Sequence, residues 1–201
     1  MWLKICGMTD QAAVDAALAA GVDALGFVFS PSVRRLEPAQ AVQLAARARG
    51  RVAVIAVTLH PPQALVDEIV RVFSPDALQA DQSDFERLRL PLTLARLPVL
   101  RVDVAAGSVL PTRLLFEGAR SGSGEAADWQ VAARLALRCE LILAGGLTAH
   151  NVGAALRAVR PYGVDVSSGV ESSAGRKSAQ KIAEFVAAAR VASEEVNHDA
   201  S

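Results

Sequence analysis

The sequence has little cysteine. Cys6 and Cys139 are the only two among 201 residues. A chain of this length can build a sizeable core without disulfides, and two free thiols are typical of a protein in a reducing compartment. Two cysteines are also too few for a cysteine-based zinc cluster. We therefore expect no metal ion and no other cofactor in this protein.

An excess of charge of one sign is also absent. Lys plus Arg and Asp plus Glu both number 21, which gives a formal net charge of zero. A balanced charge gives no reason to expect a nucleic-acid partner, although it leaves room for a local basic pocket.

Long apolar runs and a leader segment are missing as well. No stretch reaches the roughly 20 apolar residues that a membrane-spanning helix needs, and the N-terminus lacks a charged-then-apolar leader. Hydrophobic residues make up 52% of the chain, which predicts one compact domain over residues 1–193 and a polar tail over residues 194–201. We expect a soluble, cytoplasmic protein with no membrane partner, present as a monomer or a weak homodimer.

Eight short apolar runs alternate with helical patterns along the chain. The runs are Trp2–Cys6, Ala24–Phe29, Val52–Val57, Asp76–Gln79, Leu97–Val102, Arg113–Glu117, Glu140–Ala144 and Gly163–Ser167. This alternation predicts a parallel sheet covered by helices, and eight units favour a closed (β/α)8 TIM barrel of the α/β class. The connection from Asp103 to Pro111 is too short for a full helix, so we expect a reduced fifth helix. An open doubly wound sheet is the alternative, but no Gly-x-Gly-x-x-Gly turn follows the first run.

Several helix ends can also be predicted from capping residues. Thr9 is expected to cap a helix from Asp10 to Ala20, and Thr148 to cap a helix that ends at Pro161. The residues from Glu194 onward are polar and are expected to fray.

Cys6, at the end of the first predicted strand, is a candidate nucleophile or base. Active sites of barrels lie where strands end and the following loops begin. Lys4 shares the face of Cys6 because side chains alternate along a strand, and an ammonium group about 6–7 Å away would favour the thiolate. The alternative is a small buried hydrophobe, as most free cysteines are.

Glu117 ends the sixth predicted strand and shares a face with Leu115. A carboxyl group at the mouth of an apolar barrel could have a raised pKa and act as an acid. The alternative is a solvated carboxylate, or one in a salt bridge with Arg120.

Glycine and serine residues follow the last two predicted strands. Gly145 and Gly146 follow the seventh strand, and Ser168 and Gly169 follow the eighth. Exposed backbone N–H groups at such positions suit a phosphate, and barrels often hold a phosphate after these two strands. The alternative for Gly145 and Gly146 is a simple turn.

Two further polar residues are candidate binding groups. Asp165 lies within an apolar run, so we expect it to face the barrel interior and to need a partner, either a substrate hydroxyl or Lys4. Arg34 and Arg35 could clamp a carboxylate, although one or both could lie in solvent.

Four motifs resemble those of the phosphoribosylanthranilate isomerase family, in the family's order and over nearly the whole chain. They are Lys4-Ile5-Cys6-Gly7-Met8-Thr9, Gly26-Phe27-Val28-Phe29 with Ser32-Val33-Arg34, Leu143-Ala144-Gly145-Gly146-Leu147 with Asn151-Val152, and Gly163-Val164-Asp165-Val166-Ser167-Ser168-Gly169-Val170-Glu171. The short connection from Asp103 to Pro111 is also similar to the family, in which the fifth helix is reduced.

The resemblance implies an isomerase of tryptophan biosynthesis with phosphoribosylanthranilate as its small-molecule substrate. A general acid protonates the furanose ring oxygen and opens the ring to a Schiff base, and a general base then removes the C2′ proton. The family's base matches Cys6, and its contact to the anthranilate carboxylate matches Arg34. The glycines and serine of the last two loops hold the phosphate, and the aspartate matching Asp165 is at the substrate.

The chain departs from the family pattern at three places. Glu117 stands where the family has an aspartate as its general acid, and glutamate keeps the acid while adding one methylene. The usual Gln-Leu-His-Gly after the fourth strand is Gln79-Ala80-Asp81-Gln82, and the usual Lys-Asp before the last helix is Lys177-Ser178. We interpret the last two departures as structural.

Two other functions remain open. A histidine-pathway aminoaldose isomerase uses two carboxylates, and an aspartate would be expected in place of Cys6. A non-catalytic phosphosugar-binding barrel would keep the phosphate loops but would need neither Cys6 nor Glu117.

Overall fold

Eight parallel strands form a closed barrel in which each strand pairs with the next along the chain. The computed structural model describes residues 1–105, 108–118 and 127–198. The strands are β1 (Trp2–Cys6), β2 (Ala24–Val28), β3 (Ala53–Val57), β4 (Ala77–Asp81), β5 (Ala95–Leu100), β6 (Arg113–Phe116), β7 (Glu140–Leu143) and β8 (Gly163–Val166). Pairing of β1 with β8 closes the barrel. The predicted TIM barrel is therefore confirmed.

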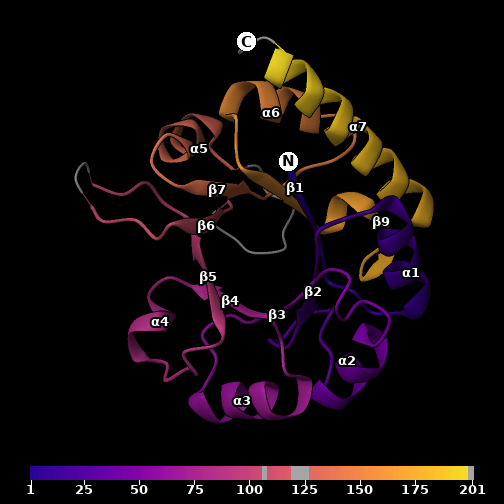
Figure 1. Cartoon of the computed structure of the whole chain (residues 1–201), viewed down its shortest axis with the longest axis vertical. Helices are drawn as coiled ribbons and strands as arrows, with labels where there is room; N and C mark the ends of the chain where they lie inside the picture. The colour runs from indigo at the N-terminus through magenta and orange to yellow at the C-terminus, as the bar shows by residue number, and fades with distance from the viewer. Residues whose placement is uncertain (106–107, 119–126, 199–201) are drawn as a thin grey trace.

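Helices form a ring outside the barrel (Figure 1). They are α1 (Gln11–Ala20), α2 (Pro38–Ala45), α3 (Gln63–Glu68), which continues as a π-helix over Ile69–Phe73, α4 (Asp84–Arg87), α5 (Trp129–Ala136), α6 (Val152–Val159) and α7 (Ala179–His198). Between β5 and β6, the described residues 101–105 and 108–112 contain no helix, and both flanks of this connection reach outward from the ring (Figure 1). The reduced fifth helix agrees with the prediction.

A short 3₁₀ helix and a hairpin join β8 to α7. The 3₁₀ helix covers Ser168–Val170, and the antiparallel strands β9 (Glu171–Ser173) and β10 (Arg176–Lys177) follow it. This segment places the residues after β8 beside the end of β1, where the site is found.

The apolar residues form two layers on the two sides of the barrel wall. The larger layer packs the helices against outward-facing strand residues such as Leu3 and Ile5. The smaller layer fills the interior with Ala24, Ile55, Ala77, Leu97, Val99, Leu115, Ile142 and Ala144. Lys4 pairs in register with Ala24 and has no exposed surface, so Lys4 and Cys6 both face inward, as the alternation predicts.

The two predicted threonine caps are wrong. Asp10 caps α1 by accepting the Ala13 N–H at 2.8 Å, whereas the Thr9 hydroxyl donates to the carbonyl of Gly175 at 2.7 Å. Asp10 is closer than Thr9 to the first amides of α1 and bonds to one of them. Thr9 instead connects the start of α1 to the hairpin through its bond to Gly175.

Helix α6 begins after Asn151 and not at Thr148. The Asn151 side chain accepts the Thr148 N–H at 2.7 Å and donates to the Gly146 carbonyl at 2.9 Å. These bonds close the loop after β7, so the first turn of α6 starts three residues later. The helix ends at Val159, because Arg160 takes a positive φ of 50°.

Helix α7 continues past the predicted boundary at residue 194. It runs without a break to His198, because neither Gly nor Pro interrupts the chain there. The expected frayed tail is therefore helical up to His198, and residues 199–201 lie outside the described part of the chain.

Candidate active site

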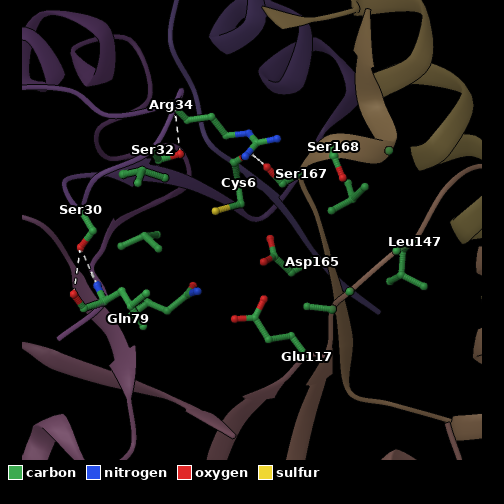
Figure 2. A pocket seen from close by; sticks show the side chains of 18 of the residues that line it. Cys6, Ser30, Ser32, Arg34, Gln79, Glu117, Leu147, Asp165, Ser167 and Ser168 are labelled. Atoms are coloured by element: carbon green, nitrogen blue, oxygen red, sulfur yellow. Dashed lines mark hydrogen bonds between the residues drawn. The ribbon is translucent and has the colours of Figure 1, made fainter. Parts of the chain in front are cut away.

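One cavity of about 330 Å³ opens at the carboxyl ends of the strands. All eight residues predicted to form the site line it, namely Cys6, Arg34, Glu117, Gly145, Gly146, Asp165, Ser168 and Gly169. Figure 2 shows Cys6 and Glu117 pointing into it from different sides, with Asp165 between them. This is the end of the fold where barrels place their active sites.

A missing side chain at Gly26 makes the room that the Cys6 thiol occupies. Cys6 pairs in register with Gly26 on the neighbouring strand. A Cβ atom at Gly26 would lie 2.9 Å from Cys6 Sγ and 3.2 Å from Lys4 Cε, both closer than ordinary contacts. Gly26 therefore fixes where the thiol can lie.

The pKa of the Cys6 thiol is raised. Burial raises it most, the positive charge of Lys4 lowers it, and the negative charge of Asp165 raises it further. Lys4 thus lowers the pKa of the Cys6 thiol, as predicted, but the effect of burial is larger. The raised pKa favours the protonated thiol over the thiolate.

Lys4 has a partner inside the barrel. Its ammonium nitrogen lies 2.9 Å from Asp165 Oδ1, and the two residues pair in register on β1 and β8. Burial alone lowers the pKa of Lys4, but the negative charges of Asp165 and Cys6 outweigh it and raise the pKa. The expected pairing of Asp165 with Lys4 is confirmed.

Glu117 is nearly buried and forms an ion pair with Arg101. Arg101 Nη1 lies 2.5 Å from Glu117 Oε1, and the backbone N–H of Glu117 donates to the Leu100 carbonyl at 3.1 Å. The partner considered from the sequence, Arg120, lies outside the described residues. Sequence reasoning missed Arg101, although its position at the end of the neighbouring strand was a usable signal.

Arg34 is buried and held by Glu171. Arg34 Nε and Nη2 donate to the two oxygens of Glu171 at 2.7 and 2.9 Å. Its aliphatic chain packs on Gly7, where a Cβ atom would lie 2.5 Å from Arg34 Cδ. Arg35 is exposed and pairs with Glu37. The open question of which arginine lies in solvent is therefore answered: it is Arg35.

A second cation completes this cluster. Lys177 Nζ lies 2.8 Å from Glu171 Oε1 and 3.0 Å from the Ser167 carbonyl, and the Ser167 hydroxyl donates to the Cys6 carbonyl at 3.0 Å. Burial raises the pKa of Glu171, but hydrogen bonds from Arg34 and Lys177 overcome it and lower the pKa to about 2. The cluster joins the ends of β1 and β8, which sequence reasoning missed.

The loops after β7 and β8 pack tightly on each other. Gly145 and Gly146 have φ angles of 87° and 64°, a region that favours glycine. A Cβ atom at Gly169 would lie 1.9 Å from the Leu147 carbonyl oxygen, so only glycine lets the two loops meet. Among the hydrogen bonds of the described residues, none uses the backbone N–H of Gly145, Gly146, Ser168 or Gly169.

The described residues contain neither a group of side chains that could hold a metal ion nor a membrane-spanning helix. No group of three or more His, Cys, Asp or Glu side chains is placed to hold a metal ion. No helix in the described part of the chain is both long and apolar enough to cross a membrane.

A TIM barrel with a cysteine, two carboxyl groups and glycine-rich loops around a cavity at the carboxyl ends of its strands is typical of barrel enzymes that act on small molecules. Comparison with known proteins identifies the family within this class. The model of the N-(5'phosphoribosyl)anthranilate (PRA) isomerase family matches residues 3–188. The chain belongs to this family.

Individual relatives agree with this assignment. The chain is 39% identical to the N-(5'-phosphoribosyl)anthranilate isomerase of Rhodopseudomonas palustris, over 94% of this chain and 98% of that one. The crystal structure of phosphoribosyl anthranilate isomerase from Thermus thermophilus superposes with a TM-score of 0.82 at 30% identity, covering 95% of this chain and 99% of that one. A further isomerase structure, in complex with reduced 1-(o-carboxyphenylamino)-1-deoxyribulose 5-phosphate, matches with a TM-score of 0.74 at 25% identity, covering 95% and 99% of the two chains.

Proposed function

We propose that this protein catalyses the Amadori rearrangement of N-(5'-phosphoribosyl)anthranilate to 1-(2-carboxyphenylamino)-1-deoxyribulose 5-phosphate, a step of tryptophan biosynthesis. Family membership supports the reaction. The single observation that carries the site assignment is that Cys6 and Glu117 enter one cavity together with the glycine loops after β7 and β8.

Glu117 is the general acid in this proposal, and Cys6 is the general base. Glu117 donates a proton to the furanose ring oxygen, the C1′–O bond breaks, and a Schiff base forms. The Cys6 thiolate then takes the C2′ proton, which leaves an enolamine that tautomerises to the ketone. Glu117 has then lost one proton and Cys6 has gained one, so a net transfer of one proton from the thiol to the Glu117 carboxylate, directly or through solvent, restores both groups for the next turnover.

The base needs its thiolate form, and the charges around Cys6 bear on how it forms. The positive charges of Lys4 and Lys177 both lower the pKa of the thiol, against the effect of burial.

Different residues of the cavity bind the two anionic ends of the substrate. The free amides of Gly145, Gly146, Ser168 and Gly169 suit the phosphate. Glu171 accepts one N–H each from Nε and Nη2 of Arg34, which leaves both N–H groups of Nη1 and the second N–H of Nη2 for the anthranilate carboxylate. Asp165, already paired with Lys4, lies between the two reacting groups (Figure 2).

A fluorescence assay for the loss of phosphoribosylanthranilate tests the proposal. Purified protein is expected to consume it with a kcat of about 1–10³ s⁻¹, the usual range for enzymes. Binding without turnover would favour the non-catalytic phosphosugar-binding barrel. Turnover of a histidine-pathway aminoaldose in place of this substrate would favour the related isomerase.

We also propose that the protein works in the cytoplasm as a monomer or weak homodimer. Two free cysteines and a net charge of zero support this. Light scattering across a concentration series tests the oligomeric state, and a stable higher oligomer at low concentration would contradict it.

A further inference from the structure

Three neighbouring strands each contribute one charged residue to a linear chain of ion pairs at the mouth of the barrel. Asp81 ends β4, Arg101 follows β5, and Glu117 follows β6. Arg101 Nη2 lies 2.7 Å from Asp81 Oδ1, and its Nη1 lies 2.5 Å from Glu117 Oε1. The guanidinium group therefore bridges two carboxylates.

The three residues differ in their access to the cavity. Glu117 lines it, whereas Arg101 and Asp81 are not among its lining residues. All three side chains are more than four-fifths buried, with exposed fractions of 18% for Arg101, 16% for Asp81 and 12% for Glu117. Arg101 therefore does not line the cavity itself, and it contacts a residue that does, Glu117.

Glutamate has one more rotatable bond than the aspartate of the family pattern, so its carboxyl group needs more restraint to stay in one place. Arg101 supplies that restraint at Oε1.

A guanidinium group beside an acid also carries an electrostatic cost, because positive charge favours the ionised carboxylate. Burial opposes the charge on Arg101, but hydrogen bonding to Asp81 and the charge of Glu117 raise the pKa of Arg101, which stays charged. The carboxylate of Asp81 offsets this charge, so the Asp81–Arg101 pair can hold Glu117 without a full positive charge acting on it.

We infer that Arg101 is a positioning residue for Glu117, and that Asp81 neutralises Arg101 so that Glu117 can carry the proton it donates. The inference rests on the proposed function, in which Glu117 is the acid. Asp81, which the sequence alone suggested was structural, thereby acquires a role in the reaction.

Among the described residues, His60, Cys6 and Asp165 are further titratable groups near this chain of ion pairs. His60 Nε2 lies 3.6 Å from Asp81 Oδ2 at the exposed end. Cys6 and Asp165 share the cavity with Glu117. None of these residues is itself replaced in the variants below, and of the three only His60 faces a group that changes, the carboxylate of Asp81 in Asp81→Asn.

The test compares kcat across pH for the wild type, Arg101→Ala, Arg101→Lys and Asp81→Asn. Arg113→Ala is the control, because Arg113 begins β6 at the end opposite to Glu117 and pairs there with Glu140 at 2.7 Å. Far-UV circular dichroism and melting curves check the fold of each variant.

Arg101→Ala is expected to lower the limiting kcat about ten- to hundredfold, the scale of a misplaced catalytic group, with KM within about threefold of wild type. The alkaline limb of its kcat–pH profile, where Glu117 loses its proton, moves to higher pH. The reason is that removal of the positive charge of Arg101 makes the ionised carboxylate less favourable. Asp81→Asn moves the same limb to lower pH, because the charge of Arg101 is no longer offset. Arg101→Lys restores the position of the limb and part of the rate.

Opposite shifts distinguish positioning of the acid from a structural role, which would lower stability and leave the limb in place. Asp81→Asn keeps the size of the side chain. If the alkaline limb of its kcat–pH profile does not move, the inference is overturned, even if Arg101→Ala does not fold. Shifts in the same direction for both variants overturn it as well.

A second readout needs no turnover. In urea unfolding, Arg101→Ala and Glu117→Gln are combined, and the double variant is expected to lose less stability than the two single variants added together. Additive losses overturn the inference. A wild type without isomerase activity would instead contradict the proposed function, and the unfolding cycle would still decide whether Arg101 holds Glu117.

Discussion

The ammonium group of Lys4 lies 2.9 Å from the carboxylate of Asp165 inside the barrel, and Lys4 has no exposed surface. A buried charge is tolerated only with a partner. Lys4 and Asp165 are also the charged groups with the largest effects on the pKa of the Cys6 thiol, which Lys4 lowers and Asp165 raises.

Replacing Lys4 by Met is expected to destabilise the protein by about 3–5 kcal/mol, because the Asp165 carboxylate would remain buried without its partner. Urea unfolding measures the loss. Arg47→Met, which breaks an exposed pair with Asp15 of 2.7 Å, is the control and is expected to cost less than about 1 kcal/mol. Equal losses in the two variants would contradict the interpretation of Lys4.

Cys6→Ser is expected to lower kcat about 10²–10⁴-fold, the usual scale for an acid–base group, because a serine hydroxyl is a far weaker base than a thiolate. The melting temperature should change little. Cys139 lies outside the cavity and its thiol donates to the Leu135 carbonyl at 3.3 Å, so Cys139→Ser is the matched control. Activity near the wild-type level in Cys6→Ser would move the base to another residue.

Glu117→Gln is expected to lower kcat about 10²–10⁴-fold, because glutamine has the shape of the acid and no proton to donate. Glu117→Asp keeps the acid one methylene further from Arg101 and should retain part of the rate. Steady-state kinetics with phosphoribosylanthranilate measures both. An unaffected Gln variant would refute the assignment of the acid, and Asp128 would be the next candidate.

Gly26→Ala is expected to lower kcat about ten- to hundredfold, because displacing a catalytic group by about 1 Å has an effect of this size. The new methyl group would lie 2.9 Å from Cys6 Sγ, so the thiol must move. Gly153→Ala on α6 is the control, since its nearest neighbour would be 3.5 Å away. Unchanged kcat in Gly26→Ala would show that the thiol has room to adapt.

Glu171 predicts a pH dependence of stability. Its pKa falls from the model-compound value of 4.5 to about 2 in the folded protein. The folded state therefore binds fewer protons than the unfolded state between these values. The stabilisation is present in full above pH 4.5 and is lost as the pH falls toward 2.

Glu171→Gln removes this contribution, so its free energy of unfolding should fall less steeply than that of the wild type below pH 4.5. Urea unfolding at several pH values between 2.5 and 6 measures the difference in slope. Parallel curves for the two proteins would mean that Glu171 is not the group that titrates.

Much of the fold and the position of the site could be predicted from local patterns. Eight apolar runs that alternate with helical patterns predict the barrel, and the carboxyl ends of these runs predict where the cavity lies. The predictions of Thr9 and Thr148 as caps were wrong because the capping residue is the one whose position and conformation suit the first turn of the helix, and neighbouring residues compete for that role. Asp10 and Asn151 are one and three residues beyond the predicted caps, and local pattern does not separate such neighbours.

The sequence by itself determined the barrel, its closure by eight strands, and eight of the residues that line the cavity. Alternation along each strand decides which side chains point inward, and that is a local property. Only the tertiary structure decided the partners: Arg101 for Glu117, Glu171 for Arg34, and Gly26 beside Cys6. These contacts join different strands and loops, and their geometry depends on the register between strands. For Arg34 and Glu171 the separation is 137 residues along the chain, a distance over which no local pattern carries information.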